Sequence, residues 1–345
     1  MSIIWDDQTF FSIGNYDNFI IQESEPFIFF DLDNTLIEFK TKKLKILPNV
    51  INKINSLTMN NIAIVTNQKG LNKNKDRLDA WKIKVNELCK ILSKKMLIFV
   101  CFDSKYRKPL PYILDNIKYN KDGSIFCGDA GGAIGDFSDT DFKFAKNLNI
   151  KFIHNKEFFN NQNVSCNINY PIVNNSSVEK IFNDLLNKIP TNELNIIVNV
   201  GMSGSGKSSI AELFVGHGYK RINSDTQKLT TNACIKLCAN YANNNEKIII
   251  DNTNPEKKTR LEYINIAKKY KIPIYCIYYN IDKGICMHNN IYRHLTKNVP
   301  IVPKIAYNIF SKKLEIPDIN EGFKDIVELN ESYANDDPIY KQYLF

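Results

Sequence analysis

Residues 27–35 read Phe-Ile-Phe-Phe-Asp-Leu-Asp-Asn-Thr, an apolar run followed at once by two acids one residue apart. A short apolar run of this kind is typical of a strand buried on both faces of a parallel sheet. Ligands of such sheets gather at the carboxyl ends of the strands. We therefore expect Asp31 to present its carboxylate as a nucleophile at the sheet edge, with Asp33 as general acid and then base.

A second stretch repeats this layout. The mostly apolar residues 196–200 run into Gly-Met-Ser-Gly-Ser-Gly-Lys-Ser at 201–208. This pattern between a strand and a helix predicts a phosphate loop, whose backbone N–H groups surround the phosphates of ATP. Lys207 would reach the β- and γ-phosphate oxygens, and Ser208 would hold Mg²⁺. The residues expected to bind the nucleotide are Gly201, Ser203, Gly204, Ser205, Gly206, Lys207, Ser208 and Ser209.

Both stretches belong to longer alternations of apolar runs and helical patterns, which predict an α/β fold with two mostly parallel sheets covered on both faces. We expect a short extension at 1–24, a first domain at 25–160, an Asn/Ser-rich linker at 161–177 and a second domain at 178–345. The expected strands are 27–30, 62–65, 97–101, 125–127, 151–153, 195–200, 219–222, 247–250 and 274–279. The expected helices are 77–93, 112–117, 142–148, 178–189, 208–215 and 257–270.

Further residues of the first domain complete a phosphatase that uses a carboxylate nucleophile. Such an enzyme needs a metal ion and a cation on the phosphoryl oxygens besides its two acids. Thr66 ends the next strand, Lys108 lies in a loop, and Asp129 follows a third strand. The expected Mg²⁺ ligands of this domain are Asp31, Asp33 and Asp129. Asp136 and Asp141 follow closely, each either as a metal ligand or as a helix cap.

The acceptor side of the second site is expected at the ends of neighbouring strands. Asp225 could take the proton from an attacking hydroxyl. Arg260 could stabilise charge on the transferred phosphoryl group, or form a surface ion pair instead. Residues 251–255, Asp-Asn-Thr-Asn-Pro, could position metal-bound water or the phosphate loop. A lid would carry Arg293 as a phosphate contact and His288 either as another contact or as a satisfied polar residue.

The composition limits the partners and the compartment. A formal net charge of +8 and a pI near 8.8 favour a polyanionic partner, nucleic acid above all. Eight cysteines without a Cys-x-x-Cys pair argue for reduced core residues and against a disulfide or zinc framework. We see no signal peptide and no apolar run of the ~18 residues that suggest a membrane span, so we expect an intracellular protein, nuclear or cytoplasmic.

In order, the motifs of the first domain resemble the four signatures of the haloacid dehalogenase superfamily. The two domains together resemble the bifunctional polynucleotide 3′-phosphatase/5′-kinase family, from about residue 25 to residue 330. The resemblance implies a haloacid dehalogenase-like Rossmannoid sheet followed by a P-loop kinase with a lid. The segments that carry it are 31–37, 65–71, 106–109, 128–131, 136–147, 201–209, 223–226, 251–255, 288–290 and 321–323.

This resemblance implies an enzyme that strips 3′-phosphates through an aspartyl-phosphate at Asp31 and phosphorylates 5′-hydroxyls from ATP. DNA ends in strand-break repair are the expected substrate, with a ligase and repair proteins as partners and a monomer as the working form. Residues 1–24 are too few for the forkhead-associated domain of animal members. The segment from Gly131 to Asp136 is shorter than theirs, and Ile291 stands where relatives often place an Arg.

Other functions stay open at this point. RNA ends are the nearest alternative, because the sequence shows no motif that recognises the 2′-hydroxyl by which RNA differs from DNA. A small-molecule kinase/phosphatase, for instance one acting on sugars, is disfavoured by the positive charge. A nucleic-acid-binding scaffold with inactive sites is disfavoured because the sets are complete, with Asp31, Asp33, Lys108, Asp129, Lys207, Ser208 and Asp225 all present.

Overall fold

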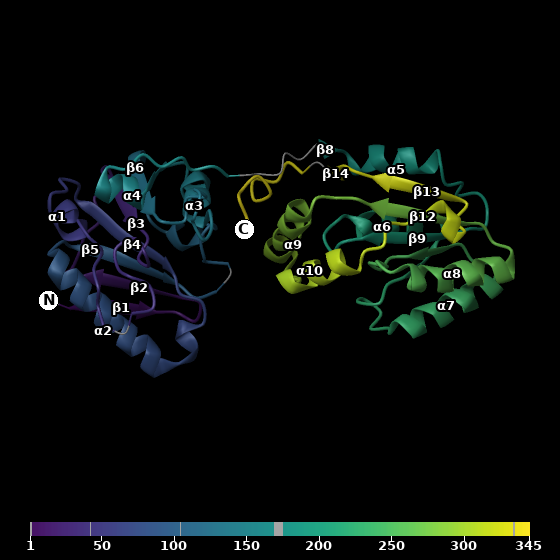
Figure 1. Cartoon of the computed structure of the whole chain (residues 1–345), viewed down its shortest axis with the longest axis horizontal. Coiled ribbons are helices and arrows are strands. Elements are labelled where there is room, and N and C mark those ends of the chain that lie inside the picture. Colours follow the sequence, from purple (N-terminus) through teal and green to yellow (C-terminus); the bar gives the residue numbers. More distant parts are fainter. Residues whose placement is uncertain (1, 42, 104, 169–174, 334) are drawn as a thin grey trace. The chain divides into compact units, whose positions relative to one another are not determined.

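The computed structural model describes residues 2–41, 43–103, 105–168, 175–333 and 335–345. The chain separates into two compact units, one of Met1–Tyr170 with Lys341–Phe345 and one of Pro171–Tyr340 (Figure 1). Residues 169–174 of the expected linker lie outside the described residues. Both units are α/β structures, which confirms the expected fold class. All eight cysteines are free, and seven of them are buried, whereas Cys166 is only half-buried. The described helices include none that is both long and apolar enough to cross a membrane.

The first unit is built on a seven-stranded sheet with the order β1-β2-β5-β4-β3-β6-β7. Strands β3 to β7 run parallel, as expected, whereas β1 and β2 pair antiparallel with each other, and β2 pairs antiparallel with β5. Residues 1–24, expected as an extension, therefore contribute two strands to this sheet. The strands are β1 (Ile3–Asp7), β2 (Phe11–Tyr16), β3 (Pro26–Phe30), β4 (Asn61–Asn67), β5 (Met96–Cys101), β6 (Asn120–Gly128) and β7 (Lys151–His154).

Alternate residues of a strand point to opposite faces of a sheet. Because these residues are apolar on both faces here, helices cover both faces. Ile28 and Phe30 pack with α1, α2 and α4, whereas Phe27 and Phe29 pack with α3. Residues 112–117, expected as a helix, form only a 3₁₀ turn, since so short a segment gains too few hydrogen bonds to continue. The helices are α1 (Val50–Asn55), α2 (Lys75–Leu92), α3 (Thr140–Leu148) and α4 (Asn155–Asn160), with 3₁₀ turns at Leu71–Lys73 and Tyr112–Leu114.

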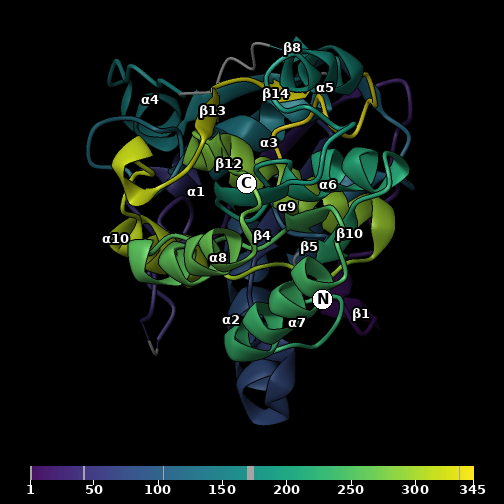
Figure 2. The same cartoon turned by 90° about the vertical axis from the view of Figure 1, so that its right-hand side faces the viewer.

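The second unit has a fully parallel five-stranded sheet in the order β10-β11-β9-β12-β13, with the phosphate loop after its central strand. Helices α5, α6, α9 and α10 pack on one face, and α7 and α8 lie side by side on the other (Figure 2). The strands are β9 (Ile196–Gly201), β10 (Lys220–Ile222), β11 (Ile248–Ile250), β12 (Ile274–Tyr279) and β13 (Asp325–Leu329), with a separate pair β8 (Asn175–Ser176) and β14 (Ser332–Tyr333). The helices are α5 (Val178–Leu186), α6 (Lys207–Gly216), α7 (Thr231–Asn243), α8 (Lys257–Tyr270), α9 (Lys283–Lys297) and α10 (Lys304–Lys313), with a 3₁₀ turn at Ile319–Glu321.

Candidate active sites

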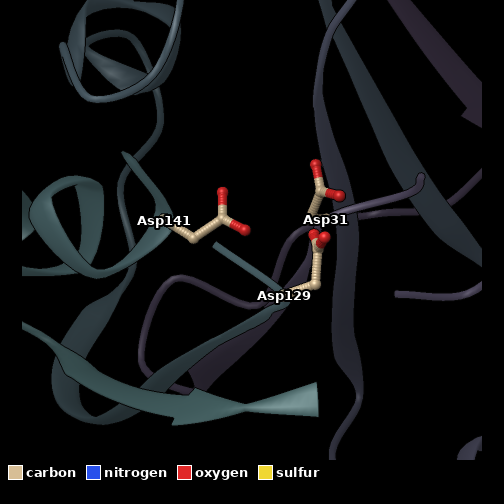
Figure 3. Close-up of side chains that lie close together, drawn as sticks. All are labelled: Asp31, Asp129 and Asp141. Atoms are coloured by element: carbon tan, nitrogen blue, oxygen red, sulfur yellow. The ribbon is translucent and has the colours of Figure 1, made fainter. Parts of the chain in front are cut away.

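Three carboxylates meet at the carboxyl edge of the first sheet. Asp31 follows β3, Asp129 follows β6, and Asp141 lies in the first turn of α3. One oxygen of each lies within 4.8 Å of the others, and Figure 3 shows the carboxylate of Asp141 pointing toward the other two. Lys108 joins this acidic cluster, because its Nζ lies 2.5 Å from Asp31 Oδ1 and 2.7 Å from Asp141 Oδ1.

Backbone contacts fix the elements that carry the cluster. The N–H of Asp31 donates to the carbonyl oxygen of Cys127 on β6 at 2.9 Å. The Asp141 side chain accepts from the N–H of Ala130 at 3.2 Å, which ties α3 to the end of β6. Gly128 leaves the room that this contact needs, since a Cβ there would lie 2.1 Å from Asp141 Oδ2. The glycine is thus required for the helix to bring its acid to the cluster.

Burial dominates the ionisation of the cluster. It raises the pKa of Asp31, with Lys108 acting in the opposite direction. Burial also raises the pKa of Asp129 to about 6, and the neighbouring Asp141 carboxylate adds to this shift. Burial alone would lower the pKa of Lys108, but Asp141 and Asp31 outweigh it and raise that pKa above its ordinary value. Lys108 therefore carries a positive charge between two acids.

The residues of the acidic cluster fit a divalent cation. Three carboxylates share one lysine, so a charge of +2 would balance them. Carboxylate oxygens are also the ligands that Mg²⁺ prefers in proteins. Asp31 and Asp129, both expected as ligands, lie in this cluster. Asp141, for which two roles were open, lies there with them.

Asp33 lies in a separate polar chain. Gln68 Nε2 donates to Asp33 Oδ2 at 2.6 Å and to Thr66 Oγ1 at 3.0 Å. Among the described residues, the acidic cluster does not include the Asp33 carboxylate, which was expected as a metal ligand. Burial raises the pKa of Asp33, although the hydrogen bond from Gln68 acts the other way. A raised pKa moves this carboxyl group toward the range in which a general acid works.

Asp136 closes a loop instead of joining the cluster. Its Oδ2 accepts from the N–H groups of Gly131 and Ala133, each at 3.0 Å. Both of its carboxylate oxygens lie 3.2 Å from His154 Nε2. Of the two acids whose role was open, the geometry therefore assigns Asp136 to the loop and Asp141 to the cluster.

The second unit contains a cavity of about 510 Å³ beside the phosphate loop. Lys207 Nζ is folded onto the loop, donating to the carbonyl oxygens of Gly201 (2.9 Å) and Met202 (2.5 Å), with Ser205 Oγ at 3.4 Å. Burial lowers the pKa of Lys207 to about 8, and the charge of Asp251 offsets only part of this shift. The expected nucleotide-binding residues that line the cavity are Ser203, Gly204, Gly206, Lys207, Ser208 and Ser209.

Two glycines allow the loop to pack closely around a ligand. Gly204 and Gly206 have φ angles of +80° and +96°. A Cβ on Gly204 would lie 2.2 Å from the carbonyl oxygen of Cys286, and one on Gly206 would lie 2.3 Å from the ring of Tyr333. The Tyr333 hydroxyl also donates to the Gly206 carbonyl oxygen at 2.8 Å. Only glycine permits this cradle, which fits the phosphates of a nucleotide.

Asp251, at the end of β11, lies next to the loop. Its Oδ2 accepts from Ser208 Oγ at 3.0 Å and also from Arg221 and Asn223. The side chain is buried, and its Oδ1 has no hydrogen-bond partner among the described residues. A buried carboxylate oxygen without a partner, beside a serine hydroxyl, fits a Mg²⁺ ion bound with the nucleotide. Asp251 is therefore itself a candidate metal ligand, whereas the sequence predicted only that residues 251–255 position metal-bound water or the phosphate loop.

The expected base and the expected lid residue both reach the cavity. Asp225 is exposed and lines it, and so does Arg293 on α9. Helix α9 also contacts the phosphate loop, because Asn289 Nδ2 donates to a loop carbonyl oxygen at 2.9 Å. His288 Nε2 donates to the carbonyl oxygen of Tyr340 at 2.8 Å, and burial lowers the pKa of His288 to about 4. His288 is thus a neutral, satisfied residue, the second of the two roles left open.

Arg260 is an expected catalytic residue that the structure does not bring to the cavity, and the expected nucleotide-binding residues Gly201 and Ser205 are not among its described lining residues either. The described residues that line the cavity do not include Arg260, and its side chain is 0% exposed. Its Nε and Nη2 donate to the two carboxylate oxygens of Glu321 at 2.9 and 2.6 Å. Its Nη1 donates to the carbonyl oxygens of Asn254 and Pro255 at 3.2 and 2.8 Å. Arg260 therefore fastens the loop after β11 to the turn at Ile319–Glu321.

We expect Arg260→Met to lower the free energy of unfolding of the second unit by about 3–5 kcal/mol, because Glu321 would remain buried without its cation. The double variant Arg260→Met/Glu321→Leu should recover most of the loss, since both charges are then replaced by apolar side chains. Urea unfolding measures both variants, and their phosphate-transfer rates are compared under folded conditions. A stable double variant that is slower than wild type by about 10²-fold would instead support a transition-state role for Arg260.

Three residues enter the sites without having been expected there. Gln68 bonds to Asp33, Arg221 bonds to Asp251, and Tyr333 covers the phosphate loop. Gln68 and Arg221 lie at or beside strand ends, a signal that could have found them. Tyr333 lies in the two-residue strand β14 without a motif around it, so nothing in the sequence pointed to it.

Comparisons with known proteins agree with a chain of two catalytic parts. Residues 26–159 match a family model described as polynucleotide kinase 3 phosphatase, and residues 196–315 match one described as an AAA domain. The chain is 32% identical over 337 residues to the bifunctional polynucleotide phosphatase/kinase of Schizosaccharomyces pombe, covering 90% of this chain and 80% of that protein. It is 34% identical over 369 residues to a protein of Acanthamoeba polyphaga mimivirus that provisionally bears the same name, covering 91% and 87%. Among solved structures, Chaetomium thermophilum Kti12 in complex with ADP-AlF3 is 15% identical with a TM-score of 0.32, covering 43% of this chain and 95% of that one.

Proposed function

Because this chain belongs to the bifunctional polynucleotide phosphatase/kinase family, we propose that it heals nucleic-acid ends, and DNA strand breaks in particular. It removes 3′-phosphates in the first unit and transfers the γ-phosphate of ATP to 5′-hydroxyls in the second. The observation that carries this proposal is the presence of an acidic phosphatase cluster and a phosphate-loop cavity on one chain. Ends carrying a 3′-hydroxyl and a 5′-phosphate are substrates for ligation, so a ligase is the implied partner.

In the first unit, Asp31 attacks the phosphorus of the 3′-phosphate, and the bond to the sugar 3′-oxygen breaks, leaving an aspartyl-phosphate. Asp33 donates a proton to the departing 3′-oxygen and then takes one from the water that hydrolyses the aspartyl-phosphate. Lys108 and the Thr66 hydroxyl contact the phosphoryl oxygens. The chemistry that bound Mg²⁺ supplies is neutralisation of the phosphoryl charge, and its ligands would be Asp31, Asp129 and Asp141.

In the second unit, the phosphate loop surrounds the β- and γ-phosphates with N–H groups. Lys207 exchanges the loop carbonyl oxygens for phosphate oxygens, which favours the charged form of a lysine whose pKa burial lowers. Asp225 takes the proton from the attacking 5′-hydroxyl, and Arg293 contacts the phosphates. Ser208 and Asp251 would hold the Mg²⁺ that shields the charge of the transferred group.

The loop between β6 and α3 supports a nucleic-acid substrate. Asp129 precedes this loop and Asp141 follows it, so it begins and ends at the acidic cluster. A hydrogen bond of 3.1 Å from the N–H of Gly132 to the carbonyl oxygen of Ser138 closes it. Within it, the side chain of Phe137 is 100% exposed. An exposed aromatic ring on a loop whose two ends lie at a phosphate site suits stacking on an unpaired base.

We expect Phe137→Ser to raise KM for a single-stranded oligonucleotide 3′-phosphate by about 5- to 150-fold, which corresponds to about 1–3 kcal/mol of base stacking. Turnover of glycerol phosphate, which has no base, should stay at the wild-type rate. Steady-state kinetics on both substrates measure this, with Ile4→Ser on the outermost strand β1 as an exposed apolar control. Equal losses on both substrates would contradict a base contact and indicate that Phe137 supports the cluster itself.

The proposed function is tested on one DNA oligonucleotide with a 5′-hydroxyl and a 3′-phosphate, incubated with Mg²⁺ and labelled ATP. An RNA of the same sequence and free sugar phosphates are run in parallel. We expect both DNA ends to change, and to change faster than the RNA ends. Faster turnover of RNA would move the proposal to RNA end repair. Faster turnover of sugar phosphates than of either oligonucleotide would contradict the nucleic-acid substrate.

A further inference from the structure

Residues 341–345 pack as part of the first unit. The N–H of Tyr343 donates to Asn147 Oδ1, and the carbonyl oxygen of Tyr343 accepts from Asn147 Nδ2, both at 2.8 Å. The next side chain, Leu344, is only 3% exposed. A backbone group paired in both directions, beside a buried apolar side chain, fixes the segment in one position.

One partner of this segment is α3, whose first turn holds Asp141. Lys143 Nζ donates to the backbone oxygen of Phe345 at 2.8 Å and pairs with Asp139 at 2.8 Å. Lys143 and Asn147 are four residues apart, so they lie on the same side of the helix. Residues 341–345 therefore hold one side of the helix that brings a carboxylate to the acidic cluster.

The other partner is the loop that carries Lys108. Asn147 Nδ2 also donates to the carbonyl oxygen of Pro109 at 2.8 Å, so one amide joins α3, this loop and Tyr343. On its other flank, the backbone of Lys108 exchanges hydrogen bonds of 2.9 and 3.0 Å with the side chain of Asn67. Losing Tyr343 would remove two of the three hydrogen bonds that fix the Asn147 side chain, so its contact with the loop at Pro109 would be held less firmly.

We propose that residues 341–345 are a positioning element for phosphate removal, which sets Lys108 against Asp31 and Asp141 by way of Asn147. The inference rests on the proposed phosphatase function of the acidic cluster. Lys108 Nζ reaches Asp31 and Asp141 at 2.5 and 2.7 Å from a loop that belongs to neither of their elements. A displacement of about 1 Å in a catalytic group can cost about 10²-fold in rate.

The first test removes residues 341–345 from the otherwise full chain. We expect kcat for phosphate release from a 3′-phosphorylated oligonucleotide to fall by about 10- to 100-fold, with KM nearly unchanged. The kinase rate of the same preparation should match wild type. A synthetic peptide of residues 340–345 should restore kcat when added. An unchanged kcat, or a loss that follows a lowered melting temperature and that the peptide does not reverse, would overturn the proposal.

A second test keeps the segment and changes its anchor. Asn147→Ala should lower kcat like the truncation, whereas Asn116→Ala, at an exposed asparagine of the same unit, should not. Combining Asn147→Ala with the truncation should be no slower than either change alone, because both break one connection. Additive losses, or a wild-type kcat in folded Asn147→Ala, would overturn the proposal even where the truncated chain unfolds. A wild-type protein that releases no phosphate would contradict the proposed function instead.

Discussion

Asp31→Asn is expected to slow 3′-phosphate release by about 10⁴-fold or more, while the kinase on the same chain keeps its wild-type rate. A neutral amide lacks the negative charge that attacks phosphorus, so no aspartyl-phosphate can form. Asn has nearly the same shape as Asp, so the packing at the end of β3 should survive. Lys108 retains Asp141 at 2.7 Å, so the substitution does not leave a buried lysine without a counter-charge.

Single-turnover release of labelled phosphate measures this change, and the labelling of 5′-ends by the same preparation shows that the second unit is intact. The matched control is Asp122→Asn, at an exposed position on β6. It makes the same chemical change away from the acidic cluster and should leave both rates unaltered. An Asp31→Asn variant within about tenfold of wild type would indicate direct attack by water, with Asp31 only as a metal ligand.

The residues that gather at each site are those whose signal is local in the sequence. Asp31 and Asp129 follow apolar runs, so a strand at each run already puts both acids at one edge of the sheet. The roles of Asp136 and Asp141 could not be separated in this way, because a helix start is uncertain by one or two residues. Only the observed start of α3 shows which of these two acids faces the cluster.

Contacts between distant residues explain the rest. The sequence placed Arg260 on a helix, but Glu321, which pairs with it, lies 61 residues away and gives no local signal. The same holds for Asn147 and Tyr343, which are 196 residues apart. The spacing of residues in the sequence also does not give the orientation of a side chain. Asp33 was therefore expected as a metal ligand, whereas its carboxylate accepts a hydrogen bond from Gln68. These assignments depend on packing, which follows from the whole chain and not from a motif.

The elements that escaped prediction have weak apolar patterns. Strand β2 includes Gly14 and Asn15, and β1 ends in two acids, so neither shows a clear strand signal. Helix α9 is rich in His and Asn, and much of what fixes it comes from its ends and its neighbours. Asp282 caps its first turn by accepting from the N–H groups of Gly284 and Ile285. The place of the phosphate loop between a strand and a helix, in contrast, was predicted directly, because its signal lies within eight positions.

Lys207→Ala should lower the rate of 5′-phosphorylation by about 10³-fold and leave 3′-phosphate release unchanged. The lysine is buried at the phosphate loop, where a positive charge interacts more strongly with phosphate than it would in water. The variant also removes a donor from the carbonyl oxygens of Gly201 and Met202, so its melting temperature must be compared with that of wild type. Lys236→Ala, at an exposed lysine on α7, is the matched control and should keep both rates.

Mixing the two variants, each of which lacks one activity, gives the sharpest form of this prediction. Asp31→Asn retains the kinase and Lys207→Ala retains the phosphatase, so together they should heal both ends of one oligonucleotide. The proposed chemistry requires no transfer between the sites, because the 3′-phosphate and the 5′-hydroxyl are separate groups that can be processed in separate encounters. If each variant keeps its own activity but the mixture leaves one end unhealed, the two reactions must instead be coupled on a single bound substrate. That result would contradict two independent sites while leaving the role of each residue intact.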